Sequence, residues 1–109
     1  MSKGIITLCG STKFYKTFQD VNKELTLQGY IVLPIGAVLD KTAEQDNKIF
    51  RLKAMLDELH KEKIAMSNAI FVLDVDGYIG KSTKSEIEFA KKHNKKIYYL
   101  SERNYKLCE

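Results

Sequence analysis

The sequence predicts a single three-layer α/β domain with a mostly parallel sheet of four or five strands. A chain of 109 residues fits one domain. Short β-rich apolar runs alternate with segments of helical periodicity in the order β-α-β-α-β-α-β, which predicts parallel strands and right-handed crossovers. The strongest run, residues 69–75, begins with five consecutive apolar residues and is typical of a strand buried on both faces.

The first half of the chain supplies two of the strands and one helix. Residues 4–9 form a short apolar run that predicts the first strand. Apolar side chains then recur at i, i+4, i+7 and i+11, which predicts a helix over residues 12–28 that ends at Gly29. Residues 30–33 predict the second strand, and residues 36–45 show no clear period.

The second half repeats the alternation. A long amphipathic helix is predicted from about residue 46 to residue 66. The buried strand at residues 69–75 follows, and then a helix over residues 83–93. Residues 97–100 are rich in β-branched and aromatic side chains and predict the last strand, after which residues 101–109 are expected to form a tail.

Composition points to an ordinary globular protein, with 44% hydrophobic and 29% charged residues and a net charge of +4. The positive charge comes from 16 scattered lysines and only 2 arginines, so we expect a solvated surface and no polymeric nucleic acid partner. The two cysteines, Cys9 and Cys108, lack metal-site spacing and fit free thiols in a reducing cytoplasm. We expect no metal, cofactor, signal peptide or membrane segment, and a homodimer or larger oligomer would help so small a core bury apolar surface.

The loop after the first strand is the first candidate binding element, because ligands of parallel α/β domains bind beyond the carboxyl ends of strands. Gly10 lets backbone approach a ligand, Ser11 and Thr12 can donate hydrogen bonds, and Lys13 adds a positive charge. The same residues fit equally well a tight turn with Ser11 as the helix N-cap.

The loop after the third strand contains Gly80-Lys81-Ser82, which imitates the end of a phosphate-binding P-loop. That motif needs a glycine five positions before Gly80, and Val75 stands there. Nucleotide hydrolysis through a P-loop is therefore excluded. Gly10 likewise lacks the following glycines of a dinucleotide-binding fingerprint.

Glu86 is the sharpest candidate for chemistry. It lies about one turn into a predicted helix close to the strand ends, where a carboxylate can be aimed at a ligand. Thr83-x-x-Glu86 also matches a capping box, in which Glu86 would fold back onto the start of its own helix. Local sequence leaves both interpretations open.

Four further side chains are candidates with competing interpretations. Strand alternation predicts that Asp74 and Asp76 point to the same side, where a carboxylate suits acid catalysis or a sugar hydroxyl, although Asp76-Gly77 also favours a turn. His60 lies on the long helix and matters only if that face meets the site. Tyr78 could stack on a base or cover the loop.

Together these residues resemble the nucleoside 2-deoxyribosyltransferase-like superfamily, which includes the 2′-deoxynucleoside 5′-monophosphate N-glycosidases. The resemblance spans roughly residues 4–100. It rests on Cys9-Gly10-Ser11, residues 68–74, Gly80-x-Ser82-Thr83-x-x-Glu86-Ile87-x-x-Ala90 and Lys96-Ile97. It implies a flavodoxin-like or Rossmann-like domain, often a homodimer or larger oligomer.

The resemblance also implies roles for individual residues. Glu86 falls on the glutamate nucleophile of the family, and residues 10–13 fall on a phosphate-binding loop. Three positions depart from the family pattern. Glu88 stands where glycine is usual, Lys13 replaces an arginine and keeps only a point charge, and Gly80 replaces an aspartate of the transferases.

The sequence therefore predicts an enzyme acting on the N-glycosidic bond of a nucleoside or nucleotide, as a 2-deoxyribosyltransferase or a deoxynucleotide N-hydrolase. Glu86 would attack the sugar, with Asp74 and His60 as further catalytic residues. The expected ligand-binding residues are Gly10, Ser11, Thr12, Lys13, Asp76, Gly77, Tyr78, Gly80, Ser82, Thr83 and Ser85. The alternatives are a non-catalytic protein of the same fold that senses or sequesters a nucleotide, and a structural module in which Glu86 only caps its helix.

Overall fold

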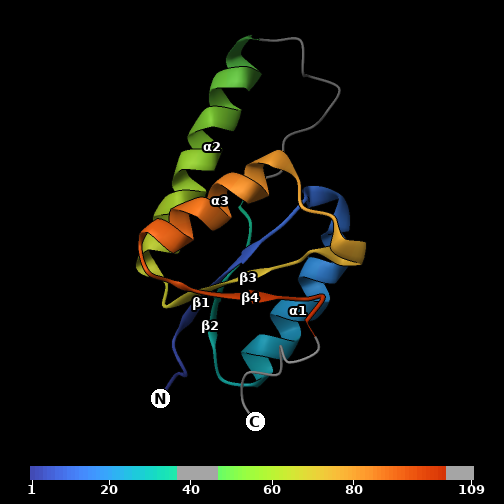
Figure 1. Cartoon of the computed structure of the whole chain (residues 1–109), viewed down its shortest axis with the longest axis vertical. Coiled ribbons are helices and arrows are strands. Elements are labelled where there is room, and N and C mark those ends of the chain that lie inside the picture. Colours follow the sequence, from blue (N-terminus) through green and yellow to red (C-terminus); the bar gives the residue numbers. More distant parts are fainter. Residues whose placement is uncertain (37–46, 103–109) are drawn as a thin grey trace.

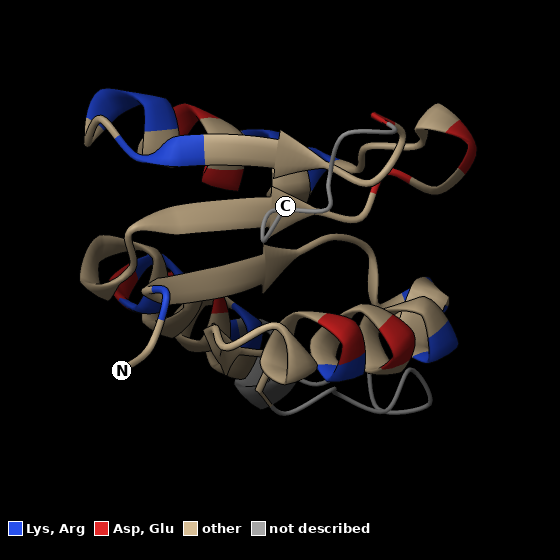
Figure 2. Cartoon of the chain, turned by 90° about the horizontal axis from the view of Figure 1, so that it is seen from below, with Lys and Arg blue, Asp and Glu red and all other residues tan. Residues whose placement is uncertain are grey.

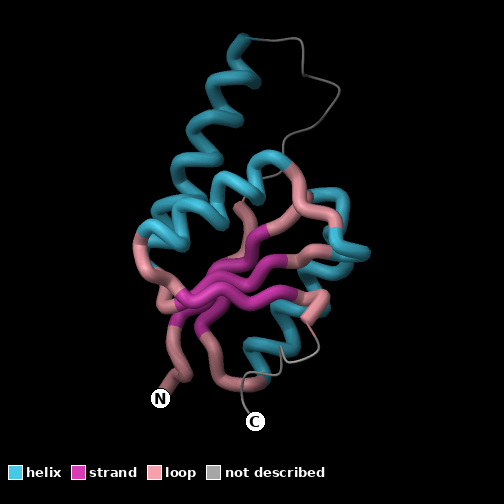
Figure 3. Tube along the Cα trace, in the orientation of Figure 1, coloured by secondary structure: helices cyan, strands magenta, loops and turns pink. Residues whose placement is uncertain are grey.

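The described part of the chain is a three-layer α/β domain with an all-parallel sheet (Figures 1 and 3). The structure is a computed structural model and describes residues 1–36 and 47–102. The strands are β1 (Ile5–Cys9), β2 (Ile31–Leu33), β3 (Ala69–Val72) and β4 (Lys96–Tyr99), and their order in the sheet is β2-β1-β3-β4. The helices are α1 (Tyr15–Leu27), α2 (Asn47–Met66) and α3 (Lys81–Lys92), with short 3₁₀ helices at η1 (Thr12–Phe14) and η3 (Val75–Gly77). The predicted fold class and parallel sheet are confirmed.

One face of the sheet packs against α1. Phe18, Val21 and Leu25 of this helix form a buried cluster with Leu8 of β1 and Phe71 of β3. The three helical residues follow the spacing that predicted the helix, so the periodic apolar stripe is the face that enters the core. Burial of each such side chain stabilises the fold by roughly 1.5–3 kcal/mol.

The opposite face packs against α2 and α3. Ile64 of α2 and Ile87 of α3 form a second buried cluster with Cys9, Ile70 and Val72. Alternate residues of β3 therefore face opposite helix layers, which explains why the strand is apolar throughout. Charged residues lie mainly on the helices and turns, and the strands are uncharged except at the start of β4 (Figure 2).

The third strand is shorter than predicted. It ends at Val72 rather than residue 75, although the Leu73 N–H still donates to the Cys9 carbonyl at 2.8 Å. The chain then turns through η3, where Asp76 has a left-handed φ of 53°. The expectation that Asp74 and Asp76 share one face of a strand is therefore wrong, because a turn begins between the strand and Asp76.

Other boundaries differ by one to three residues. The helix predicted over residues 12–28 divides into η1 and α1, and α3 begins at Lys81 rather than residue 83. Residues 37–45 of the expected loop, most of the expected tail, and Cys108 lie outside the described residues. None of the helices in the described ranges is long and apolar enough to cross a membrane.

Candidate functional site

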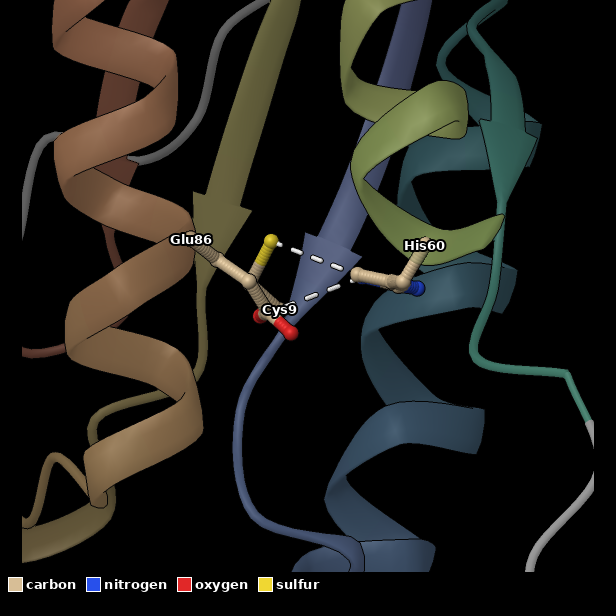
Figure 4. Close-up of side chains that lie close together, drawn as sticks. All are labelled: Cys9, His60 and Glu86. Atoms are coloured by element: carbon tan, nitrogen blue, oxygen red, sulfur yellow. Dashed lines mark hydrogen bonds and ion pairs between the residues drawn. The ribbon is translucent and has the colours of Figure 1, made fainter. Parts of the chain in front are cut away.

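Three buried side chains from three elements meet at the carboxyl end of β1 (Figure 4). Cys9 is the last residue of β1, His60 lies on α2 and Glu86 lies on α3, and their exposed fractions are 0%, 7% and 8%. The sulfur of Cys9, a ring nitrogen of His60 and a carboxylate oxygen of Glu86 all lie within 4.8 Å of one another. These residues form the Cys9–His60–Glu86 cluster.

Glu86 belongs to the buried face of α3. The N-cap of this helix is Gly80, whose carbonyl accepts from the Lys84 N–H at 2.9 Å, and no side chain caps it. Glu86 lies in the second helical turn, beyond the reach of a capping box. The buried residues of α3 follow helical spacing: Thr83, Glu86, Ile87 and Ala90. The capping-box interpretation is wrong, because the helix starts earlier and its periodicity turns Glu86 toward the sheet.

His60 is held in place by the packing of α2 on β1. One turn further along α2, the Lys63 carbonyl lies 3.2 Å from the Thr7 hydroxyl and accepts from the Ser67 hydroxyl at 2.8 Å. His60 Nε2 lies 3.0 Å from the Leu8 carbonyl oxygen. These contacts fix both the helix and the imidazole against β1, so the face of α2 that carries His60 does meet the site.

The contact with Leu8 identifies the protonated nitrogen of His60. A carbonyl oxygen can only accept, so Nε2 carries the proton and donates it. Burial, and then the charge of Lys63, lower the pKa of His60 below its ordinary value of 6.5, which favours the neutral ring at neutral pH. Nε2 lies 4.0 Å from Glu86 Oε1 and 3.7 Å from the Cys9 sulfur.

Burial also changes the acidity of Glu86 and Cys9. It raises the pKa of Glu86 from 4.5 to about 7, although the neighbouring Cys9 side chain opposes part of this rise. Burial and the nearby charge of Glu86 raise the pKa of the Cys9 thiol well above its ordinary value. Cys9 is therefore a neutral thiol that can donate a hydrogen bond, and a thiolate nucleophile is disfavoured here.

The cluster has the donor types of a zinc site, because zinc accepts sulfur, imidazole nitrogen and carboxylate oxygen. In the arrangement described, however, the Nε2 proton of His60 points to the Leu8 carbonyl, so that nitrogen offers no lone pair to a metal. The geometry fits a buried carboxylate beside a neutral imidazole better than a metal centre.

Asp74 lies in a different hydrogen-bond arrangement. Its two carboxylate oxygens accept from the Ser101 N–H at 2.8 Å and from the Ser101 hydroxyl at 2.5 Å. Asp74 thus ties the segment after β3 to the segment after β4. The structure therefore brings two of the expected catalytic residues, Glu86 and His60, together. The carboxylate of the third, Asp74, is instead hydrogen-bonded to Ser101.

The loop after β1 meets the loop after β3. Lys13 Nζ lies 3.6 Å from the centroid of the Tyr78 ring, and Phe14 contacts that ring edge to face at 6.0 Å. Ser11 Oγ accepts from the Lys13 N–H at 3.3 Å, as the expected N-cap of the short helix η1. A Cβ on Gly80 would lie 3.4 Å from the Tyr78 hydroxyl, so Tyr78 covers the start of α3.

The remaining expected binding residues lie at different depths. Thr83 is buried, whereas Thr12, Asp76, Gly77, Ser82 and Ser85 are exposed. Ser85 faces a shallow groove between α2 and α3 that Lys61 and Glu88 also line. Gly10 is closely packed, because a Cβ there would lie 3.2 Å from both Leu73 Cβ and Phe18 Cζ.

Cys9 is the member of the cluster that sequence reasoning missed. The sequence identified it as a free thiol and as part of the Cys9-Gly10-Ser11 element of the resemblance, but gave it no role in the site. Its position was nevertheless informative. As the final residue of the first strand, directly before Gly10, it had to lie at the edge of the sheet where the site was expected.

Comparison with known proteins adds no assignment. No family model matches the chain, and a search of curated proteins found no match.

Proposed function

We propose that this protein acts on the N-glycosidic bond of a nucleoside or nucleotide, as a 2-deoxyribosyltransferase or deoxynucleotide N-hydrolase, with Glu86 as the nucleophile. The observation that carries the proposal is the burial of the Glu86 carboxylate against Cys9 and His60 at the carboxyl end of β1. In a parallel sheet that edge is where ligands bind. The resemblance of the residues around Glu86 to the nucleoside 2-deoxyribosyltransferase-like superfamily supports the same role.

The reaction would follow the logic of a retaining glycosidase. One oxygen of Glu86 forms a bond to C1′ of the sugar while the C1′–N bond breaks. The base leaves with the bonding electron pair and takes a proton from water. Water, or a nitrogen of a second base, then attacks C1′ and loses its proton to the hydroxide formed in the first step, and Glu86 departs as a carboxylate with the electron pair of its bond to C1′.

Only the ionised form of Glu86 is a nucleophile, which gives the reaction a pH dependence. Because burial raises the pKa of Glu86 to about 7, the rate of base release should increase with pH up to about 7 and then level off. Because burial lowers the pKa of His60 below 6.5, the ring is neutral near pH 7 and would keep its Nε2–H for hydrogen bonding near the carboxylate.

The loops after β1 and β3 supply groups that would contact the rest of the substrate. Lys13 offers a positive charge beside the Tyr78 ring, where it could meet a 5′-phosphate, and the Tyr78 ring offers a face for stacking. Removing the charge of Lys13 should weaken the binding of a nucleoside monophosphate more than the binding of the corresponding nucleoside.

The decisive experiment incubates the protein with deoxynucleosides and their 5′-monophosphates and follows free base by chromatography. Wild type should release base, and Glu86→Gln should abolish release by removing the nucleophile. Glu88→Gln is the matched control, because Glu88 lies on the same helix with a 76% exposed side chain. Equal base release by wild type and Glu86→Gln would refute the role of Glu86.

A second candidate function is nucleotide binding without turnover. The observation that favours it is the low exposure of Glu86, 8%, because attack requires direct contact between the carboxylate and C1′. Calorimetric binding of a nucleotide without any release of base would select this alternative. Neither binding nor release for any nucleotide would reject both functions.

We also propose that the protein acts as a homodimer or larger oligomer in the cytoplasm. Met55, Leu59 and Met66 of α2 share helical spacing and have exposed fractions of 46%, 46% and 63%. A second copy that covers this stripe would bury apolar area that a small domain otherwise leaves in water. Sedimentation equilibrium should give a mass above 12.5 kDa, and Leu59→Lys should return it to the monomer value.

A further inference from the structure

We propose that Cys9 is a positioning residue whose thiol donates a hydrogen bond to the Glu86 carboxylate and leaves the other carboxylate oxygen for attack on C1′. The hydrogen bond is an inference about the cluster itself, whereas its part in attack rests on the proposed function. Neither the sequence pattern nor the family resemblance assigns Cys9 any role in orienting the nucleophile.

The acceptor of the thiol proton follows from elimination. Cys9 has no exposed surface, so water cannot accept this proton. His60 Nε2, 3.7 Å from the sulfur, is already a donor to the Leu8 carbonyl and has no lone pair to accept it. The Glu86 carboxylate is the remaining member of the cluster, and its oxygens are acceptors (Figure 4).

The direction of the Cys9 side chain is fixed by its backbone. Cys9 pairs with Val72 in the sheet, and its carbonyl accepts from the Leu73 N–H at 2.8 Å. Its side chain packs in the cluster that includes Ile87 and Ala90, the residues of α3 that flank Glu86 on the buried face. A strand residue with no freedom to move is a suitable support for a carboxylate that must hold one orientation.

A thiol is also a better partner here than a hydroxyl for a nucleophilic carboxylate. A thiol is a weak donor, so it orients the oxygen while withdrawing little of its charge. A serine hydroxyl would stabilise the ionised form more strongly, and would lower both the pKa and the nucleophilicity of the carboxylate.

Other ionisable groups act on Glu86 and must be held constant in a test. On α2, Asp57 raises and Lys61 lowers the pKa of Glu86, and His60 lies 4.0 Å away. From β1, Cys9 itself faces the carboxylate. Substitutions at Cys9 leave the three α2 residues in place, so a change in the titration of Glu86 reports on the sulfur.

The test is an NMR titration of Glu86 in protein labelled with carbon-13 at glutamate carboxyls, with the signal assigned by Glu86→Gln. Cys9→Ala removes the donor and should raise the pKa of Glu86 by about 0.5 to 1 pH unit. Cys9→Ser provides a stronger donor and should lower it. Val72→Ala, a packing change in the same apolar cluster without loss of a donor, should leave it unchanged.

Shifts of the Glu86 pKa in opposite directions in Cys9→Ala and Cys9→Ser support a hydrogen-bonding role for Cys9. If Cys9 had a purely structural role, the two substitutions would not shift this pKa in opposite directions. The inference is overturned if both variants titrate as wild type does or if both shift in the same direction. In base release, Cys9→Ala should lose up to about 100-fold in kcat with KM unchanged, and Cys9→Ser should recover part of it. The titration needs no turnover, so an inactive wild type would count against the proposed function and leave the hydrogen bond to be judged by NMR.

Discussion

Replacing Glu86 by glutamine should stabilise the folded protein, and the gain should depend on pH. Burial raises the pKa of Glu86 from 4.5 to about 7, so the folded state holds a proton that the unfolded chain has already released. The contribution of Glu86 to the free energy of unfolding is therefore greatest below pH 4.5, and it is lost as the pH rises through about 7. At about 1.4 kcal/mol per pH unit, the full loss is about 3 kcal/mol.

Glutamine keeps the size and the acceptor oxygen of the side chain but cannot ionise. The free energy of unfolding of Glu86→Gln, measured relative to wild type by urea denaturation, should therefore increase by about 3 kcal/mol between pH 4.5 and pH 8. Glu88→Gln is the control for loss of a carboxylate from the same helix, because the Glu88 side chain is 76% exposed and its contact with Lys91 is a surface ion pair; its effect on the free energy of unfolding should be small. If the difference in free energy of unfolding between Glu86→Gln and wild type does not change over this pH range, the claim that burial of the carboxylate destabilises the fold is refuted.

Three further predictions concern neighbouring parts of the site. Asp74→Ala removes both acceptors of Ser101 and should lower the free energy of unfolding by about 2 kcal/mol in urea, whereas an unchanged value would show that this contact is unimportant. Gly10→Ala places a Cβ 3.2 Å from Leu73 Cβ and should cost about 1–3 kcal/mol in the same assay, and an equally stable variant would contradict the close packing. In a variant whose other cysteine is replaced by serine, the Cys9 thiol should react with Ellman's reagent only after unfolding, because it is buried and un-ionised. Rapid reaction of the folded protein would contradict the burial of this thiol.

The order of elements was predictable because it depends on local periodicity. The stripe on α1 and the continuous apolar run of β3 identify a helix and a buried strand without knowledge of their neighbours. The end of β3 was less predictable, because Leu73 remains buried and bonded to Cys9 after the strand has ended. Apolar character therefore continued past the strand, and the left-handed turn at Asp76 had no unambiguous signal.

The candidate site was predictable in its parts but not in its assembly. Glu86 and His60 were each identified from sequence, yet their proximity depends on how α2 and α3 pack side by side on one face of the sheet, α2 against β1 and α3 against β3 and β4. The capping box failed for the same reason. A glutamate three residues after a threonine can serve a helix end or a core face, and tertiary packing decides between them. The Cys9-Gly10-Ser11 element gave Cys9 no role, so only the geometry identified it as a neighbour of Glu86.

The chemistry of Glu86 argues that its burial serves a function rather than the fold. Glutamine or an apolar side chain could fill the same space without the pH-dependent loss of about 3 kcal/mol, a large fraction of the stability of a small domain. His60, the described residue that lies within ion-pairing distance of Glu86, is held neutral by burial and cannot offset that loss with a charge. A carboxylate that destabilises the fold, lies beside a neutral thiol and is located at the carboxyl end of a parallel strand, where ligands of such sheets usually bind, has the properties of a poised nucleophile or base. The ionised form, which the fold disfavours, is also the form that would react with a sugar carbon.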